Sequence, residues 1–329
     1  MRRSLLAVAL VIAILAVAGC AGASRPDTHG GAAQGIANPA GAAGSPAASP
    51  TLSQASPPIE SVMPAASGGG GDSWVIRVVD AAGEELCVFD REYFIEPPAN
   101  AYGSPFTFIY STINNWPATR FYAATGHSVA FLLAEAGVLE TAQTVTFRAA
   151  DGYEAGLTRD QLFSEQFYFP NAGEGGAGAA PVVPIVAVLW CEGTDDTSDI
   201  REGKPVFLFG QRNPFEHTNP AFVVGVTEIV VDDSPCESWD APGTFPQPGQ
   251  IGEGDMVKLQ HPYFGLVKLH YTLDGSDPTL LSPMYNPSTY QLELNRPITI
   301  TEPTTIKAFA SGYGKNDSEI ATFEFWPAP

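Results

Sequence analysis

The sequence predicts an α+β domain over residues 73–238, followed by an all-β, immunoglobulin-like sandwich over residues 239–329. Short runs rich in β-branched and aromatic residues recur in both segments and indicate strands. The first segment alone adds a pattern with helical spacing, at residues 128–137. Prolines and glycines around residues 239–250 interrupt the strand pattern and separate the two segments.

The elements of the first segment are expected in the following order. Strands are predicted at residues 73–80 and 106–112, and a helix begins after Ser128 as N-cap and ends at Gly137. Further strands are expected in the runs TVTFRAADGYEAGLT, which turns at Asp151-Gly152, and in PVVPIVAVLW, KPVFLFG and VGVTEIVV. The Gly/Ala-rich run NAGEGGAGAA between them is predicted to be a loop.

The second segment reads as short strands at regular spacing, separated by turn residues. They are the runs DMVKLQ, LVKLHYT, PITIT, TTIKAFA and IATFEF. This spacing is typical of a β-sandwich. Asp274 and Asp277 in the run DGSDPT are interpreted as turn formers, with a calcium or sugar site as the alternative.

Residues 1–19 have the layout of an export signal. Two arginines precede an apolar run over residues 5–18, which is too short for a comfortable membrane-spanning helix. The tetrapeptide VAGC at 17–20 resembles the lipobox of bacterial lipoproteins, and this resemblance implies that Cys20 is lipidated and becomes the mature N-terminus. We therefore expect a lipid-anchored protein on the extracytoplasmic face of a bacterial cell membrane, exported by the general or the twin-arginine route.

Residues 20–72 are predicted to be a disordered tether behind the lipidated cysteine. Ala, Gly, Pro and Ser make up 37 of the 52 residues from 21 to 72. No apolar periodicity remains from which a core could form. A flexible coil of this length has a mean reach of roughly 40 Å, which would lift the folded part off the membrane.

The chain is strongly acidic, and this limits its partners. It carries 16 basic and 36 acidic side chains, a net charge of −20. Removal of residues 1–19 takes away two arginines and leaves 14 − 36 = −22. Such a surface repels nucleic acid and anionic lipid headgroups. The expected partners are the membrane, through the lipid on Cys20, and an unknown surface ligand or envelope protein, with no nucleic acid.

The other cysteines and the histidines do not indicate a metal site. No CxxC or CxxH spacing occurs, and the five histidines form no ligand pair, so zinc is not expected. Export permits a disulfide among Cys87, Cys191 and Cys236, but three cysteines leave one over. Their pairing stays open beside the alternative that they are small buried hydrophobic residues.

Two family resemblances follow from longer motifs. The runs VKLHYTLDGSDPT, SPMYN and TTIKAFASGYGKNDSEIATFEF resemble the C-terminal β-sandwich of chitobiases and hexosaminidases, an accessory module without catalytic residues. The runs STINNWPATRFYAATGHSVAFLLAEAGV, TVTFRAADGYEAGLTRDQL and VFLFGQRNPFEHTNPAFVVGVTEIVV resemble the sulfite-oxidase-like, molybdopterin-binding fold. That second resemblance covers residues 73–232 in order and spacing.

The sulfite-oxidase-like resemblance also implies a metal position, which is changed here. In that family the cysteine four residues before the tryptophan of the first motif binds molybdenum, and counting back from Trp116 gives Thr112. A threonine hydroxyl is a hard, weak donor, whereas the chemistry needs a soft thiolate. Serine ligates molybdenum in a different fold with two pterins, so oxygen ligation keeps an enzyme alternative open.

The cleft around Thr112 is expected to persist as a polar pocket. Its candidate residues are Asn114, Asn115, Trp116, Arg120, Asp151, Tyr153, Gln211, Arg212 and His217. Arg120 and Arg212 are candidate phosphate contacts or, alternatively, ion-paired surface arginines. The polar residues either bind a small ligand or brace the loops, and bracing is favoured.

Three functions therefore remain open from the sequence. The leading hypothesis is a surface lipoprotein whose first domain binds no cofactor and acts as a binding or interaction module without catalytic residues. The alternatives are a molybdopterin-dependent oxidoreductase with a non-cysteine ligand, and a carbohydrate-associated accessory protein. Fold alone does not choose among them, because function resides in the site.

Overall fold

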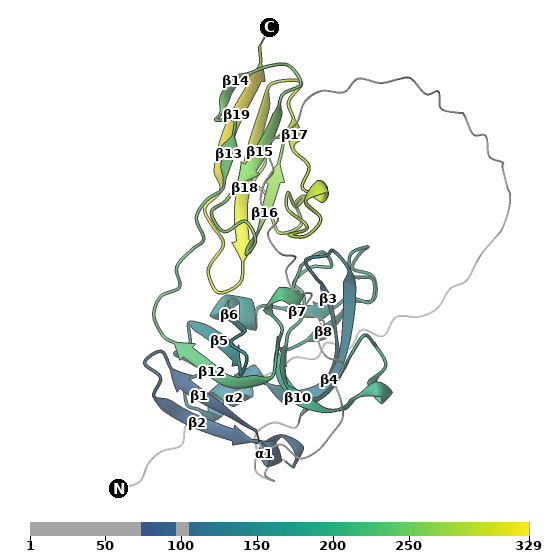
Figure 1. Cartoon of the computed structure of the whole chain (residues 1–329), viewed down its shortest axis with the longest axis vertical. Coiled ribbons are helices and arrows are strands. Elements are labelled where there is room, and N and C mark those ends of the chain that lie inside the picture. The colour runs from purple at the N-terminus through teal and green to yellow at the C-terminus, as the bar shows by residue number, and fades with distance from the viewer. Residues whose placement is uncertain (1–73, 97–104, 329) are drawn as a thin grey trace, which may run out of the picture. The chain divides into compact units, whose positions relative to one another are not determined.

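The computed structural model describes residues 74–96 and 105–328 (Figure 1). The chain divides into two units, residues 1–61 and 62–329, and all described residues belong to the second. The predicted export signal, the lipid site at Cys20 and the tether lie outside the described residues. Within the described ranges, no helix is long and apolar enough to cross a membrane.

Residues 74–232 form two five-stranded sheets. The strands of the first, in spatial order, are β2 (Glu85–Asp90), β1 (Val75–Asp80), β12 (Val226–Asp232), β5 (Thr144–Ala149) and β6 (Glu154–Thr158). Those of the second are β11 (Val223–Val224), β10 (Arg201–Leu208), β9 (Ile185–Glu192), β4 (Thr119–Ser128) and β3 (Phe106–Ile113). A two-stranded sheet of β7 (Gln166–Tyr168) and β8 (Ala180–Val182) is separate from both.

The first sheet joins the two ends of this segment. β1 pairs with β12 in parallel, with Arg77 opposite Glu228, whereas the other strand pairs of the sheet are antiparallel. β1 and β12 are more than a hundred residues apart in the chain, so this pairing closes a long loop before it gains any hydrogen bond. It therefore depends on the core that the intervening strands build.

Aromatic side chains pack the two sheets against each other. The rings of Phe147 on β5 and Phe207 on β10 are stacked with centroids 3.6 Å apart, and both residues are fully buried. Alternating buried positions on each strand supply the rest of this core, as in the burial pattern of β5. Burial of each large apolar side chain contributes on the order of 1.5–3 kcal/mol.

The helices of the described residues are few and short, which corrects the fold class expected for residues 73–238. They are α1 (Arg91–Ile95), α2 (Val129–Glu135) and α3 (Arg159–Phe163), with the 3₁₀ turns η1 (Thr197–Asp199) and η2 (Asn219–Ala221). The segment is mostly β and does not fit an α+β molybdopterin-binding fold. The one helix expected from the sequence is α2, and it spans only seven residues because Gly137 ends it early.

Local signals placed several elements correctly. Ser128 is the N-cap of α2, and its hydroxyl accepts a hydrogen bond from the Phe131 amide at 3.1 Å. Gly137 and Gly152 have φ of +76° and +90°, a left-handed conformation that favours glycine after a helix and in a tight turn. The Asp151-Gly152 turn therefore connects β5 to β6 as predicted.

Residues 243–327 form the all-β segment. One sheet contains β13 (Gly243–Phe245), β15 (Met256–Gln260) and β17 (Ile298–Thr299). The other contains β14 (Gly249–Ile251), β19 (Ala321–Pro327), β18 (Thr304–Gly312) and β16 (Val267–Thr272), and η3 (Leu292–Leu294) lies in a connection. Its core is separate from that of the first segment and centres on Val257, Leu269 and Ile306.

The cysteines of the described residues are all free thiols. Cys87, Cys191 and Cys236 are half-buried and form no disulfide. Burial raises the pKa of Cys87. The alternative of partly buried thiols is therefore the one that the structure supports.

Candidate functional site

Thr112, the position of the expected metal ligand, is part of the buried core of the site. It lies on β3 and is fully buried. Its hydroxyl oxygen accepts a hydrogen bond of 2.6 Å from the hydroxyl of Thr218, which precedes η2. The Thr112 oxygen therefore already has a protein partner.

A buried polar chain continues from the neighbouring Ser111. The Ser111 hydroxyl donates to Gln211 Oε1 at 2.6 Å and accepts from the Phe169 amide at 2.7 Å. Gln211 Nε2 donates to the Glu216 carbonyl at 2.8 Å. Ser111 and Gln211 are fully buried, so each link satisfies a group that would otherwise be costly to bury.

Arg212 is held by Glu216 rather than presented to a ligand. Its guanidinium donates to Glu216 Oε1 from Nε at 2.8 Å and from Nη2 at 2.6 Å. Burial works against the charged guanidinium, but the Glu216 carboxylate outweighs burial and raises the pKa of Arg212. Tyr313, which follows β18, donates its hydroxyl to the same carboxylate oxygen at 3.1 Å.

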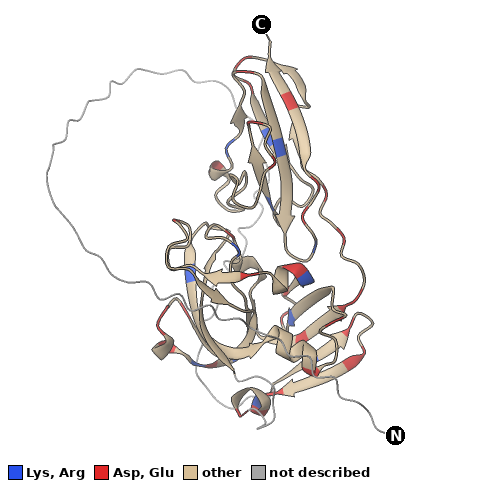
Figure 2. Cartoon of the chain, turned by 180° about the vertical axis from the view of Figure 1, so that it is seen from behind, with Lys and Arg blue, Asp and Glu red and all other residues tan. Residues whose placement is uncertain are grey.

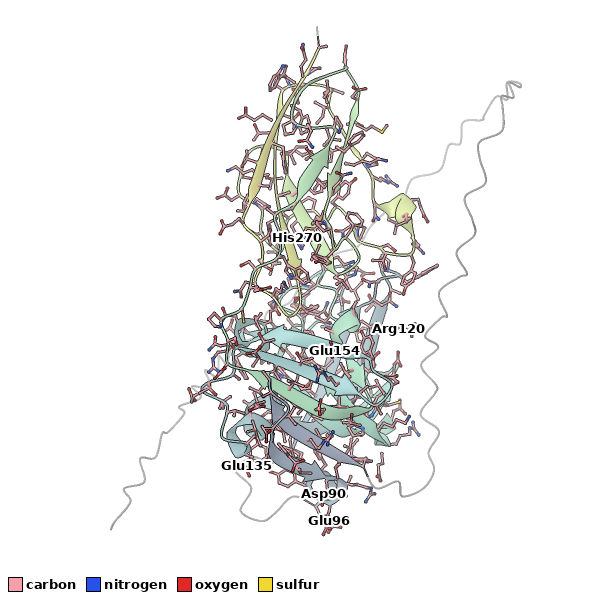
Figure 3. The ribbon with its side chains drawn as sticks, turned by 60° about the vertical axis from the view of Figure 1, so that its left-hand side comes forward. Asp90, Glu96, Arg120, Glu135, Glu154 and His270 are labelled. Atoms are coloured by element: carbon pink, nitrogen blue, oxygen red, sulfur yellow. The ribbon has the colours of Figure 1, made fainter. Side chains whose placement is uncertain are left out.

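His217 lies near two other basic side chains, Lys268 and His270. It is 8% exposed, and its Nδ1 is buried without a hydrogen-bond partner among the described residues. Burial lowers the pKa of His217 to about 3, and the charges of Lys268 and His270 act in the same direction. Burial also lowers the pKa of Lys268 to about 8, and it lowers the pKa of His270, which is labelled in Figure 3.

The run Asn114 to Trp116 forms a turn that contacts the all-β segment. Asn114 Oδ1 accepts from the amides of Trp116 and Ala118, at 2.9 and 3.0 Å. Asn115 accepts from Lys268 Nζ at 3.1 Å and, through its carbonyl, from the Ser288 hydroxyl at 2.8 Å. These two asparagines therefore brace the loops, which is the role that the sequence favoured.

Three of the predicted cleft residues make no hydrogen bond or ion pair to Thr112, Gln211, Arg212 or Glu216 among the described residues. Arg120, which is labelled in Figure 3, is about half exposed, and its guanidinium lies 3.6 Å from the Glu192 carboxylate. Asp151 accepts from the Tyr153 amide at 3.0 Å and shapes the turn. Tyr153 is half exposed and donates its hydroxyl to the Pro220 carbonyl at 2.5 Å. Both arginines are therefore ion-paired, and the phosphate contacts predicted as one alternative are not available in this arrangement.

The residues present do not fit a molybdopterin. The soft donor is replaced by a buried hydroxyl bonded to Thr218, and the central cation is neutralised by Glu216. Among the described residues, no three His, Cys, Asp or Glu side chains gather where they could hold a metal. Cys191 lies on β9, two strands from β3 and displaced along them, so at a strand spacing of about 4.8 Å its thiol is too far to replace the missing ligand.

Four residues that complete the cluster were not predicted: Glu216, Thr218, Tyr313 and Lys268. Glu216 and Thr218 flank the predicted His217, and Glu216 stands four residues after Arg212. A spacing of four residues predicts an ion pair on a helix, but these two residues lie in a loop, so the sequence did not indicate their pairing. Lys268 and Tyr313 come from the all-β segment, and only tertiary contacts reveal them.

One comparison with known families gives a match. The family model described as Fn3 associated matches residues 264–325. The chain therefore carries a fibronectin-associated type of β domain at this place, which agrees with the strands β16 to β19. No curated protein matches the chain.

Proposed function

We propose that the protein is a lipid-anchored surface protein whose first segment is a binding or interaction module, without molybdenum chemistry. Its motifs resemble the sulfite-oxidase-like family, and those of its second segment resemble the chitobiase C-terminal module. The mostly β architecture of the first segment departs from the fold that the former resemblance implies. This departure favours a scaffold that has lost the family's reaction.

The observation that carries this proposal is the state of Thr112. Its oxygen accepts from Thr218 in a fully buried setting, so ligation of a metal would first break this hydrogen bond. The thiolate needed for the family's chemistry is replaced by a hydroxyl of much higher pKa. A molybdopterin oxidoreductase with an oxygen ligand is the competing function.

Metal analysis of full-length protein from its native exporter separates these two functions. We expect molybdenum and pterin far below one per chain, and no turnover of sulfite or sulfoxides. A known molybdenum enzyme expressed in the same cells is the control that the cofactor was made. Stoichiometric molybdopterin in the unmodified protein would establish the enzyme alternative.

Thr112→Cys restores the family's ligand and tests the surrounding pocket. We expect this variant to remain free of molybdenum when it is expressed with pterin supply, because the Arg212 guanidinium is already paired with the Glu216 carboxylate. Thr112→Ser is the matched control for the loss of the threonine methyl group. Molybdenum bound by Thr112→Cys but not by Thr112→Ser would show that a cofactor pocket survives.

The anchor is tested at Cys20. The lipobox predicts a diacylated N-terminus and protein in the membrane fraction, so Cys20→Ser should release the protein or leave it unprocessed. Mass spectrometry of the N-terminal peptide and fractionation measure both outcomes. An unmodified Cys20, or cleavage at another position, contradicts the lipoprotein assignment.

A carbohydrate-associated role is the second candidate function. It is supported by the resemblance of residues 241–329 to modules that accompany carbohydrate-active enzymes and by an open groove in that segment. The groove is independent of Thr112 and of the polar cluster around it.

A further inference from the structure

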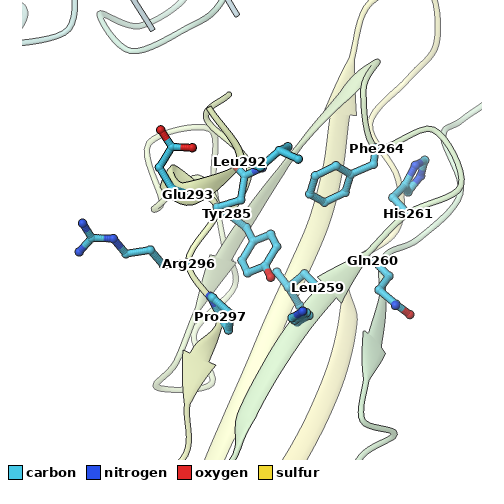
Figure 4. Close-up of a pocket in the computed structure, with 11 residues that line it drawn as sticks. Leu259, Gln260, His261, Phe264, Tyr285, Leu292, Glu293, Arg296 and Pro297 are labelled. Carbon is cyan, nitrogen blue, oxygen red and sulfur yellow. The ribbon is translucent and has the colours of Figure 1, made fainter. Parts of the chain in front are cut away.

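The all-β segment contains a groove beside strand β15. Its volume is about 600 Å³, within the range of about 300–1,000 Å³ that is common for small-ligand sites. Figure 4 shows residues of β15, of the following loop and of the connection around η3 arranged about it. The residues used below are Lys258, Gln260, Phe264, Tyr285, Asn295 and Arg296.

Apolar side chains form the floor of this groove. The rings of Phe264 and Tyr285 pack edge to face, with centroids 6.3 Å apart and an interplanar angle of 80°. Leu292 extends toward Phe264 in Figure 4 and is 63% exposed, so its side chain is accessible to a ligand. The groove therefore offers an apolar surface to the C–H face of a ligand.

Two cations border the groove without a carboxylate partner. Most arginines and lysines of the described residues are paired with Asp or Glu, but Lys258 and Arg296 form no salt bridge there. Acidic and basic residues are otherwise interspersed along the ribbon (Figure 2). In so acidic a chain, two unpaired cations on one groove favour a ligand with a negative charge. Glu293 is the one carboxylate of the lining and lies at its margin (Figure 4).

Amides complete the lining. Asn295 Nδ2 donates to the Ser288 carbonyl at 3.1 Å, while its Oδ1 is buried without a partner among the described residues. Gln260 is exposed at the end of β15. The groove lining therefore includes an exposed amide and an acceptor without a partner, which are suited to hydroxyl groups.

We propose that this groove binds an oligosaccharide that bears carboxylate groups. The pyranose C–H face contacts Phe264 and Leu292, hydroxyls bond to the amides, and a carboxylate pairs with Lys258 and Arg296, as charge-assisted hydrogen bonds favour. This inference rests on the proposed binding role but not on the chemistry at Thr112. If the protein contains no molybdenum and does not bind acidic sugars, the proposed function is retained and this inference is wrong.

Titration calorimetry of the full chain with linear tetragalacturonate tests the proposal. The matched ligand is the methyl-esterified tetrasaccharide, which keeps the skeleton and loses the charge. Pentaglutamate provides a similar charge on a peptide. We expect the acid to bind about tenfold more tightly than the ester, and pentaglutamate to bind weakly, because two exposed ion pairs together approach the factor of ten in affinity.

Variants at exposed positions locate the binding. Lys258→Gln with Arg296→Gln should weaken tetragalacturonate binding by about tenfold or more and bring it to the level of the ester. The control is Arg201→Gln with Lys204→Gln, which removes two cations of β10 that also lack a salt bridge among the described residues. Leu292→Ser should weaken acid and ester alike.

Three results would overturn the proposal. They are the absence of binding to any of the saccharides, equal affinity for acid and ester, and equal affinity for tetragalacturonate and pentaglutamate. The last result would show that the groove recognises negative charge and does not distinguish a sugar from a peptide. Equal losses in the groove variant and the β10 control would show a general charge effect.

Discussion

Replacing Glu216 by alanine is expected to lower the free energy of unfolding by about 3–5 kcal/mol, because the variant leaves the Arg212 guanidinium without its partner in a mostly buried site. The Glu216 side chain is 9% exposed and that of Arg212 is 22% exposed. The variant also removes the acceptor of the Tyr313 hydroxyl. Denaturant unfolding of the full chain, followed by tryptophan fluorescence, measures the loss.

The matched control is Glu154→Ala. Glu154, labelled in Figure 3, forms an ion pair with Arg148 in which both side chains are about half exposed. Exposed pairs of this kind contribute about 0–1 kcal/mol. Equal losses in the two variants would show that the Arg212–Glu216 pair is solvated in solution and does not brace the cluster.

Acidification from about pH 6 to pH 4.5 is expected to destabilise the protein through its buried histidines, by about 1.4 kcal/mol per pH unit for His217. The folded-state pKa of His217 is lowered to about 3, while that of an unfolded histidine is about 6.5. Between these values the unfolded chain binds a proton that the folded chain does not. Stability is therefore fully present above the unfolded value and falls as the pH falls.

His127 and His270 add to this effect with the same sign. Burial lowers the pKa of both, and His127 lies among the rings of Tyr93, Phe94 and Phe131. Carboxylates whose pKa is lowered, such as Glu202 beside Arg91, lose their contribution only at lower pH. The window above about pH 4.5 therefore separates histidine from carboxylate titration.

His217→Gln isolates the contribution of one group. Across this window the variant should take up about one proton fewer on unfolding than the unmodified protein. The slope of its unfolding free energy against pH should therefore be less steep. The charges of Lys268 and His270 lower the pKa of His217. Lys268→Met should therefore raise that pKa and make the unfolding free energy depend less steeply on pH. An unchanged slope in His217→Gln would mean that His217 is protonated in the folded state.

The candidate site could be predicted in part. The sequence brought together Thr112, Gln211, Arg212 and His217 through the order of their motifs, and these residues do lie in one cluster with Thr218 and Glu216. Arg120, Asp151 and Tyr153 make contacts that the motifs did not predict. Arg120 is paired with Thr112 across β3 and β4, which brings both residues to one face of the sheet, but its guanidinium lies 3.6 Å from Glu192.

Composition and local pattern by themselves determined the acidic character, many of the strands though not β2 or β4, the cap at Ser128 and the glycine turns at 137 and 152. These features depend on neighbours within a few residues, so the sequence contains their physical cause. Tertiary structure decided the parallel pairing of β1 with β12, the neutralisation of Arg212 by Glu216 and the contact of Lys268 with Asn115. Each of these requires residues that are distant in the chain or oriented by a loop, and their energies arise only when the cores on either side have formed.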